Sequence, residues 1–80
     1  MDKIDKFLAS LRSNERKHLV EVIFPKIRDL DLKGLNVKKL SGYDLWRVKW
    51  KDIRVLFVKT NTKGIIMTLG TRQGIYKKIN

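Results

Sequence analysis

Residues 42–78 read GYDLWRVKWKDIRVLFVKTNTKGIIMTLGTRQGIYKK, and they carry most of the information in the 80-residue chain. In the strand expected at residues 43–50, apolar and basic residues alternate from position 46 to position 50. Because neighbouring residues of a strand point to opposite faces of a sheet, Val48 shares one face with both tryptophans, and Arg47 and Lys49 share the other. One face can therefore build a core while its reverse presents fixed positive charge, an arrangement that suits a surface that binds phosphates.

Three strands are predicted in this half of the chain, at residues 43–50, 53–59 and 65–69. Lys51-Asp52 forms a tight connection between the first two, although it lacks the glycine that such hairpins prefer. Residues 61–64 read Asn-Thr-Lys-Gly and form a clearer turn. The middle strand is apolar on both faces except at Arg54, as expected for a central strand that is covered on both sides. The pattern predicts an antiparallel meander.

The first third of the chain has the apolar spacing of two helices. Asp2 is a suitable N-cap for the first helix, which extends to about Leu11. Ser13 or Asn14 can cap the second helix, and Pro25, which lacks a backbone donor, predicts a kink or break inside it. The two apolar stripes consist of Ile4, Phe7, Leu8 and Leu11, and of Leu19, Val20, Ile23, Ile27 and Leu30.

The order of these elements predicts an α+β protein with a single domain over residues 1–80. A helical hairpin over residues 2–33 is expected to pack on the sheet, because the short break makes its two helices antiparallel neighbours. Gly34 is expected to end this helical region. Residues 35–80 supply the sheet and a C-terminal segment, in which residues 75–79 are expected to close as a short helix.

The charge of the chain restricts the class of partner. Nineteen Lys and Arg residues stand against eight Asp and Glu residues, so the net charge is +11. Such self-repulsion costs stability, and nucleic acid is the commonest polyanionic partner, although a lysine-rich surface can also serve solubility alone. The absence of cysteine, the single histidine and the lack of an acidic cluster argue against a metal site, and no cofactor is expected. With no membrane-spanning run and no signal-peptide form, we expect a cytoplasmic protein.

Five residues of the C-terminal half are expected to converge on the side of the sheet away from the helices: Arg47, Lys49, Arg54, Arg72 and Tyr76. Arginine suits such a site because its planar fork binds pairs of phosphate oxygens. Structural alternatives remain open: Arg54 can pair with Asp44 or Asp52, the other cations can form a solvated face, and Tyr76 can anchor the C-terminal turn. The tryptophans are expected in the core. His18 is expected on a helix, either at the surface or at the boundary between core and surface.

Two segments, VKKLSGYDLWRVKWKDIRVLF and GTRQGIYK, together resemble the RelE/ParE superfamily of bacterial and archaeal toxins. The resemblance rests on the order of a basic KKL-G stretch, a strand with R-V-K, an arginine-bearing second strand and an R…Y pair. It covers residues 35–78 well and the helices loosely. Members usually open with a strand ahead of the helices, whereas this chain begins in helix, so the sheet is expected to lack that strand and leave an edge for a partner to cover.

The resemblance implies the toxin of a type II toxin–antitoxin system, an endoribonuclease that cuts mRNA on the ribosome without a metal. Lys49 would accept the 2′-hydroxyl proton if Arg47 and Arg54 favour its neutral form, Arg54 and Arg72 would hold the phosphate, and Tyr76 would stack on a base. The RNA-binding residues implied in addition are Arg47, Lys38, Lys39 and Lys77. An acidic antitoxin is the implied protein partner. Two alternatives remain: a gyrase-directed, ParE-like toxin without nuclease activity, and a non-catalytic nucleic-acid-binding module.

Overall fold

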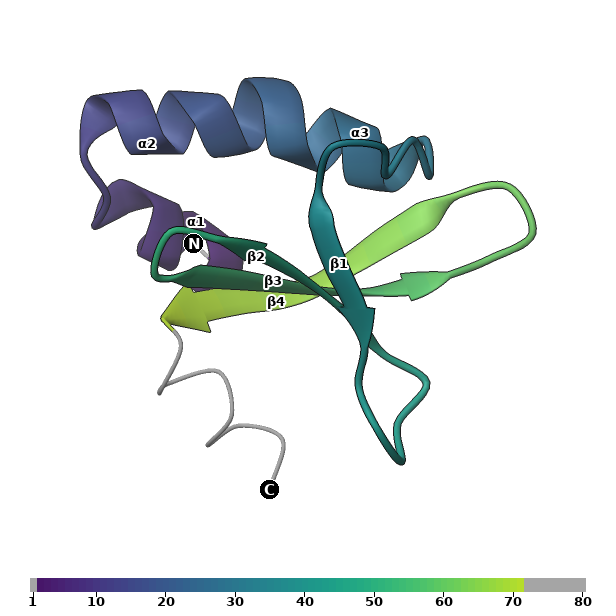
Figure 1. Cartoon of the computed structure of the whole chain (residues 1–80). Coiled ribbons are helices and arrows are strands. Elements are labelled where there is room, and N and C mark those ends of the chain that lie inside the picture. The colour runs from purple at the N-terminus through teal and green to yellow at the C-terminus, as the bar shows by residue number, and fades with distance from the viewer. Residues whose placement is uncertain (1, 72–80) are drawn as a thin grey trace.

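The helices occupy the first third of the protein in a computed structural model that describes residues 2–71. Helix α1 spans Lys3–Ala9, and the side chain of Asp2 caps it by accepting a hydrogen bond from the Asp5 amide at 2.9 Å. The chain then reverses into one long helical rod, made of α2 (Ser13–His18), η1 (Leu19–Ile23) and α3 (Phe24–Arg28) (Figure 1). The two predicted helices are therefore present.

Pro25 causes a local widening of the long helix and not a break. A proline inside a helix offers no amide hydrogen, and its ring clashes with the carbonyl four residues earlier, here that of Glu21. Residues Leu19–Ile23 form a π-helical segment just ahead of Pro25, and the Phe24 amide donates to the Leu19 carbonyl five residues back. Of the predicted kink or break, the break is absent, and the disturbance takes the form of one wide turn in a continuous rod.

The long helix ends earlier than Gly34. The Asp31 amide donates to the Lys26 carbonyl at 2.9 Å and the Leu30 amide to the Ile27 carbonyl at 3.0 Å, the two bonds of a Schellman motif. Leu30 takes the left-handed conformation, with φ of 55°, that glycine usually supplies there. Among residues 2–71, no helix has the length and apolar character needed to cross a bilayer.

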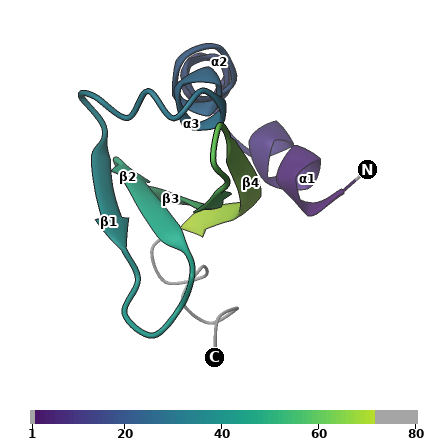
Figure 2. The same ribbon diagram turned by 90° about the vertical axis from the view of Figure 1, so that its right-hand side faces the viewer.

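The sheet has four antiparallel strands in the order β1-β2-β3-β4 (Figure 2). They are β1 (Asn36–Lys39), β2 (Trp46–Trp50), β3 (Ile53–Lys59) and β4 (Gly64–Thr71). The α+β class and the meander are confirmed. The first strand, β1, was not predicted, and β2 begins three residues later than expected because residues 43–45 belong to the connection. Within residues 2–71, no strand pairs with the outer edge of β4.

One face of the sheet packs against the helices and builds the core. Its buried residues come from both layers: Leu8, Leu19, Ile23, Phe24 and Ile27 from the helices, and Val48, Ile53, Val55, Phe57 and Leu69 from the strands. Helix α3 lies especially close to the start of β4, where a Cβ on Gly64 would come 2.2 Å from the Ile27 carbonyl oxygen. Among residues 2–71, all helices therefore lie on this one side of the sheet.

Candidate nucleic-acid interface

The register between β2 and β3 decides which cations lie together. The two-residue connection at Lys51 and Asp52 sets Trp50 opposite Ile53, and the ladder continues with Lys49 opposite Arg54 and Arg47 opposite Leu56. Val48 and Val55, which lie on the core face, occupy the positions between them. Arg47, Lys49 and Arg54 therefore share the face away from the helices, as the alternation predicted.

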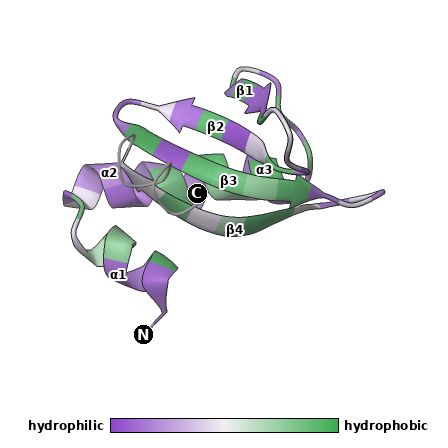
Figure 3. Cartoon of the chain, turned by 90° about the horizontal axis from the view of Figure 1, so that it is seen from below, coloured by the Kyte–Doolittle hydropathy of each residue, from purple (hydrophilic) through white to green (hydrophobic). Residues whose placement is uncertain are grey.

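Strand β1 adds a fourth cation to this face. Lys38 lies opposite Arg47, and Asn36 lies opposite Lys49. We call Lys38, Arg47, Lys49 and Arg54 the cationic face. Figure 3 looks at the sheet from this side and shows hydrophilic and hydrophobic residues alternating along β2. Lys39 lies opposite Trp46 and so belongs to the other face, apart from Lys38.

Arg54 is held in a specific way. Its side chain is only 5% exposed, and its Nη1 donates to the carbonyl oxygens of Lys51 at 3.0 Å and Ile53 at 3.1 Å. Its Nε is buried and has no hydrogen-bond partner among residues 2–71. Neither Asp44 nor Asp52 pairs with it, since the ion pair formed within residues 2–71 joins Lys51 to Glu15 at 3.8 Å. The guanidinium charge thus has no carboxylate to neutralise it in the described part of the chain.

Arg47 is also partly buried, but less completely than Arg54. It is half-buried, and its Nη2 donates to the Asn36 side-chain oxygen at 3.4 Å, while its Nε is buried with no hydrogen-bond partner in the described part of the chain. Lys38 and Lys49 are exposed. Each exposed amine is paired across strands with one of the two arginines, so the face presents two Lys–Arg rows. Asn36, which orients Arg47, was not found from the sequence, because β1 itself has little alternation.

Three of the predicted site residues, Arg72, Tyr76 and Lys77, lie outside the described residues. The last strand nevertheless reaches the site, because Gly70 lies opposite Arg54 on β4. Gly70 has no side chain, so none projects from this position beside the guanidinium. The convergence of Arg72 and Tyr76 with Arg54 stays a prediction.

Both tryptophans of the sheet lie on the core side, so among residues 2–71 neither forms a stacking platform on the cationic face. Trp46 and Trp50 are half-buried and pack against the core, as predicted. His18 stacks on Trp50 with ring centroids 4.7 Å apart, which places this histidine at the boundary of the helix as expected. The Lys59 amine lies 3.6 Å from the centroid of the Trp46 ring, and that of Lys51 lies 5.1 Å from the Trp50 ring.

The chemistry available on the cationic face is that of anion binding and proton transfer. Two constrained guanidinium groups can bind phosphate oxygens, and each arginine has an exposed lysine as its direct cross-strand neighbour. Within the described residues, no three His, Asp or Glu side chains gather where they could hold a metal ion.

These features define a small α+β fold with a basic sheet face. No protein-family model matches the chain, and no curated protein matches it either. Among solved structures, it is similar to a chain of the RelB–RelE antitoxin–toxin complex from Methanococcus jannaschii. The TM-score is 0.74 and the identity 22%, and the match covers 100% of this chain and 96% of that one. The fold is therefore RelE-like.

Proposed function

We propose that this protein is the toxin of a type II toxin–antitoxin system and acts as a metal-independent, ribosome-dependent endoribonuclease on mRNA. The observation that carries the proposal is the cross-strand pair of Lys49 and Arg54, in which an exposed lysine neighbours a buried arginine that no described carboxylate neutralises. The fold shared with a chain of an antitoxin–toxin complex supports it.

In the proposed reaction, the ribose 2′-oxygen of the substrate attacks the adjacent phosphorus. The bond from that oxygen to phosphorus forms while the bond from phosphorus to the 5′-oxygen of the next nucleotide breaks, leaving a 2′,3′-cyclic phosphate. The departing 5′-oxygen takes a proton from water and becomes a 5′-hydroxyl. Lys49 accepts the 2′-hydroxyl proton, and the free N–H groups of Arg54 stabilise the negative charge that builds on the phosphoryl oxygens. Arg47 and Lys38 bind a neighbouring phosphate.

The predicted roles of the remaining residues complete this proposal. Arg72 is the second phosphate-binding arginine, Tyr76 stacks on a base, and Lys77 adds charge near the RNA path. Lys39, which belongs to the other face of β1, contributes only long-range attraction to RNA. An acidic antitoxin is the proposed protein partner, since a chain of net charge +11 attracts an acidic segment that folds on binding.

A translation extract with mapped RNA ends tests the proposal. The wild-type protein is expected to cut ribosome-bound mRNA and leave 5′-hydroxyl ends. Lys49→Gln, an exposed substitution that leaves the core intact, is expected to slow cleavage by about 10²–10³-fold, as does removal of a group that acts in the transition state. The matched control is Lys17→Gln, which removes the same charge from an exposed position on α2.

The other function classes give different results in the same extract. Intact transcripts with stalled synthesis would overturn the nuclease. DNA breaks made with gyrase would replace it by the gyrase-directed toxin. Salt-sensitive RNA binding without cut products would indicate the passive nucleic-acid-binding module.

A further inference from the structure

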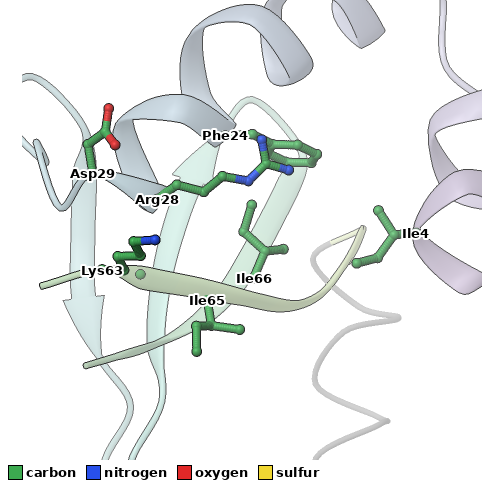
Figure 4. A pocket seen from close by; sticks show the side chains of 8 residues that line it. Ile4, Phe24, Arg28, Asp29, Lys63, Ile65 and Ile66 are labelled. Carbon is green, nitrogen blue, oxygen red and sulfur yellow. The ribbon is translucent and has the colours of Figure 1, made fainter.

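The helix side of the sheet has a hollow of about 520 Å³, between α1, α3 and the start of β4 (Figure 4). Its floor is apolar and includes Phe24 and Ile66, while Arg28 and Lys63 form a basic rim. The sheet separates this hollow from the cationic face. RNA bound to the cationic face therefore does not enter it.

Another hollow, of about 500 Å³, lies on the connection between β1 and β2, and residues 39–44 line it. We call it the β1–β2 hollow. The connection extends beyond the sheet on the side away from the helices (Figure 1 and Figure 2). It joins the two strands that carry Lys38 and Arg47, which face each other across the ladder. Its place in the fold is therefore next to one row of the cationic face.

The register of β1 and β2 continues into this connection. The Leu40 amide donates to the Leu45 carbonyl at 2.9 Å, one step beyond the last pair of the ladder. Because side chains alternate between the two faces of a sheet, Leu40 and Leu45 lie on the same side as the cationic face. Both are half-buried. An apolar pair thus follows the row of Lys38 and Arg47, about 7 Å further along the strands.

A tight turn holds Tyr43 in the β1–β2 hollow. The Tyr43 amide donates to the Leu40 carbonyl at 3.3 Å, and Gly42 has φ of 80°, as the third position of a type II turn requires. The Tyr43 side chain is 46% exposed, and among residues 2–71 it makes no stacking, cation or hydrogen-bond contact. The turn therefore presents an exposed aromatic side chain beside the apolar pair.

The chemistry of the β1–β2 hollow fits a nucleobase better than a phosphate or an aliphatic side chain. Lys39 and Asp44 are exposed and also line it, and their opposite charges leave it without net attraction for a phosphate. An aliphatic side chain gains by enclosure on several sides, whereas a base stacks on a single aromatic ring. One nucleotide brings both groups that this region can bind, a phosphate for Arg47 and a base for Tyr43.

We infer that Tyr43 and the β1–β2 hollow form a base-binding subsite for RNA, next to the phosphate bound by Lys38 and Arg47. The inference rests on the proposed function and deepens it, because it gives the path of the substrate. The RNA strand runs along β2 from the pair of Lys49 and Arg54 towards the connection. The base stacked on Tyr43 belongs to a nucleotide outside the two that flank the scissile bond, so this contact helps to set which phosphate is cut.

A binding measurement with a 2′-O-methyl hexanucleotide, which cannot be cut, tests the subsite. Tyr43→Leu keeps an apolar side chain but has no ring face, and it should weaken binding at least about fivefold, as the loss of one stacked base does. Tyr43→Phe keeps the ring and should stay within about twofold of the wild type. The slope of log affinity against log salt should stay the same in both variants, because no phosphate contact is lost.

The matched control is Val20→Ala, which shortens a side chain that is 42% exposed on the long helix and should leave the affinity unchanged. A second measurement uses the wild-type protein and a hexanucleotide with 5-iodouridine placed in turn at each position. Light should crosslink one of these to Tyr43, as mass spectrometry of the peptides can show.

Equal weakening by Tyr43→Leu and Tyr43→Phe would overturn the stacking, and crosslinks only outside residues 40–45 would overturn the subsite. Unchanged affinity in Tyr43→Leu would leave the connection to a protein partner and overturn the inference as well. A wild-type protein that cuts no mRNA but binds the hexanucleotide through Tyr43 would instead refute only the nuclease.

Discussion

Arg54 places stability and function in conflict at a single residue. Its guanidinium is almost completely buried, and its hydrogen bonds to two backbone carbonyls leave Nε without a partner. Removing a charge from water costs several kcal/mol, and apolar replacements of buried charges are often neutral or stabilising by about 1–4 kcal/mol. On the proposed function, this arginine is retained to bind phosphate and not to hold the fold.

Arg54→Met tests that balance, because methionine fills much of the same volume without charge. We expect the free energy of unfolding to stay unchanged or to rise by up to about 2 kcal/mol, while RNA binding weakens. Urea unfolding followed by tryptophan fluorescence measures the first quantity. A loss of more than about 2 kcal/mol would show that the bonds from Arg54 to Lys51 and Ile53 are needed for the β2–β3 turn.

Lys59, unlike Arg54, is a cation that we expect to stabilise the fold. Its amine lies 3.6 Å from the centroid of the Trp46 ring, so Lys59→Gln should lower the free energy of unfolding by about 0.5–1 kcal/mol. A double-mutant cycle with Trp46→Leu isolates the ring contact, because Lys59→Gln should then cost nothing further. An equal loss in both backgrounds would assign the effect of Lys59 to something other than the ring.

At the scale of elements, the sequence predicts those strands and helices whose residues follow a repeating apolar pattern. The meander follows from alternation, and the two-residue connection at Lys51 and Asp52 fixes the register that sets Lys49 opposite Arg54. Strand β1 has one apolar residue, Val37, among its four, so its pattern is too short to separate it from a loop. Its pairing, and with it the place of Lys38 beside Arg47, depends on tertiary contacts that a local pattern does not contain.

The close approach of α3 to β4 is another feature without a local signal, and Gly64 permits it. A Cβ at this position would lie 2.2 Å from the Ile27 carbonyl oxygen, a backbone atom that cannot move without moving the helix. Gly64→Ala should therefore lower the free energy of unfolding by about 1–3 kcal/mol, as overpacking does. Thermal unfolding measures the loss.

Gly42→Ala is the control for Gly64. It has φ of 80° and no atom within 4 Å of an added Cβ, so it should show only the backbone strain of the left-handed region, about 1 kcal/mol. A smaller loss for Gly64→Ala than for Gly42→Ala would show that α3 can shift away from β4 at little cost.

At the scale of the whole molecule, the sheet separates two kinds of surface. Its helix side and the edge of β4 combine apolar groups with a basic rim, while its other side presents the cationic face. A net charge of +11 alone would attract RNA to every side of so small a protein. RNA binding by the cationic face and attraction by net charge alone can therefore be told apart by comparing two variants. One removes charge from the cationic face, and the other removes the same charge elsewhere.

The salt dependence of RNA binding makes that distinction. Each phosphate contact to a single strand contributes about 0.7 to the slope of log affinity against log salt, so Lys38→Gln with Lys49→Gln should flatten the slope by about 1.4. The matched variant, Lys6→Gln with Lys17→Gln, removes the same charge from exposed helix positions and should leave the slope almost unchanged. A 2′-O-methyl oligonucleotide titrated between low and moderate salt measures affinity without cleavage. If both variants flatten the slope equally, RNA is attracted by net charge alone, and the cationic face loses its special role.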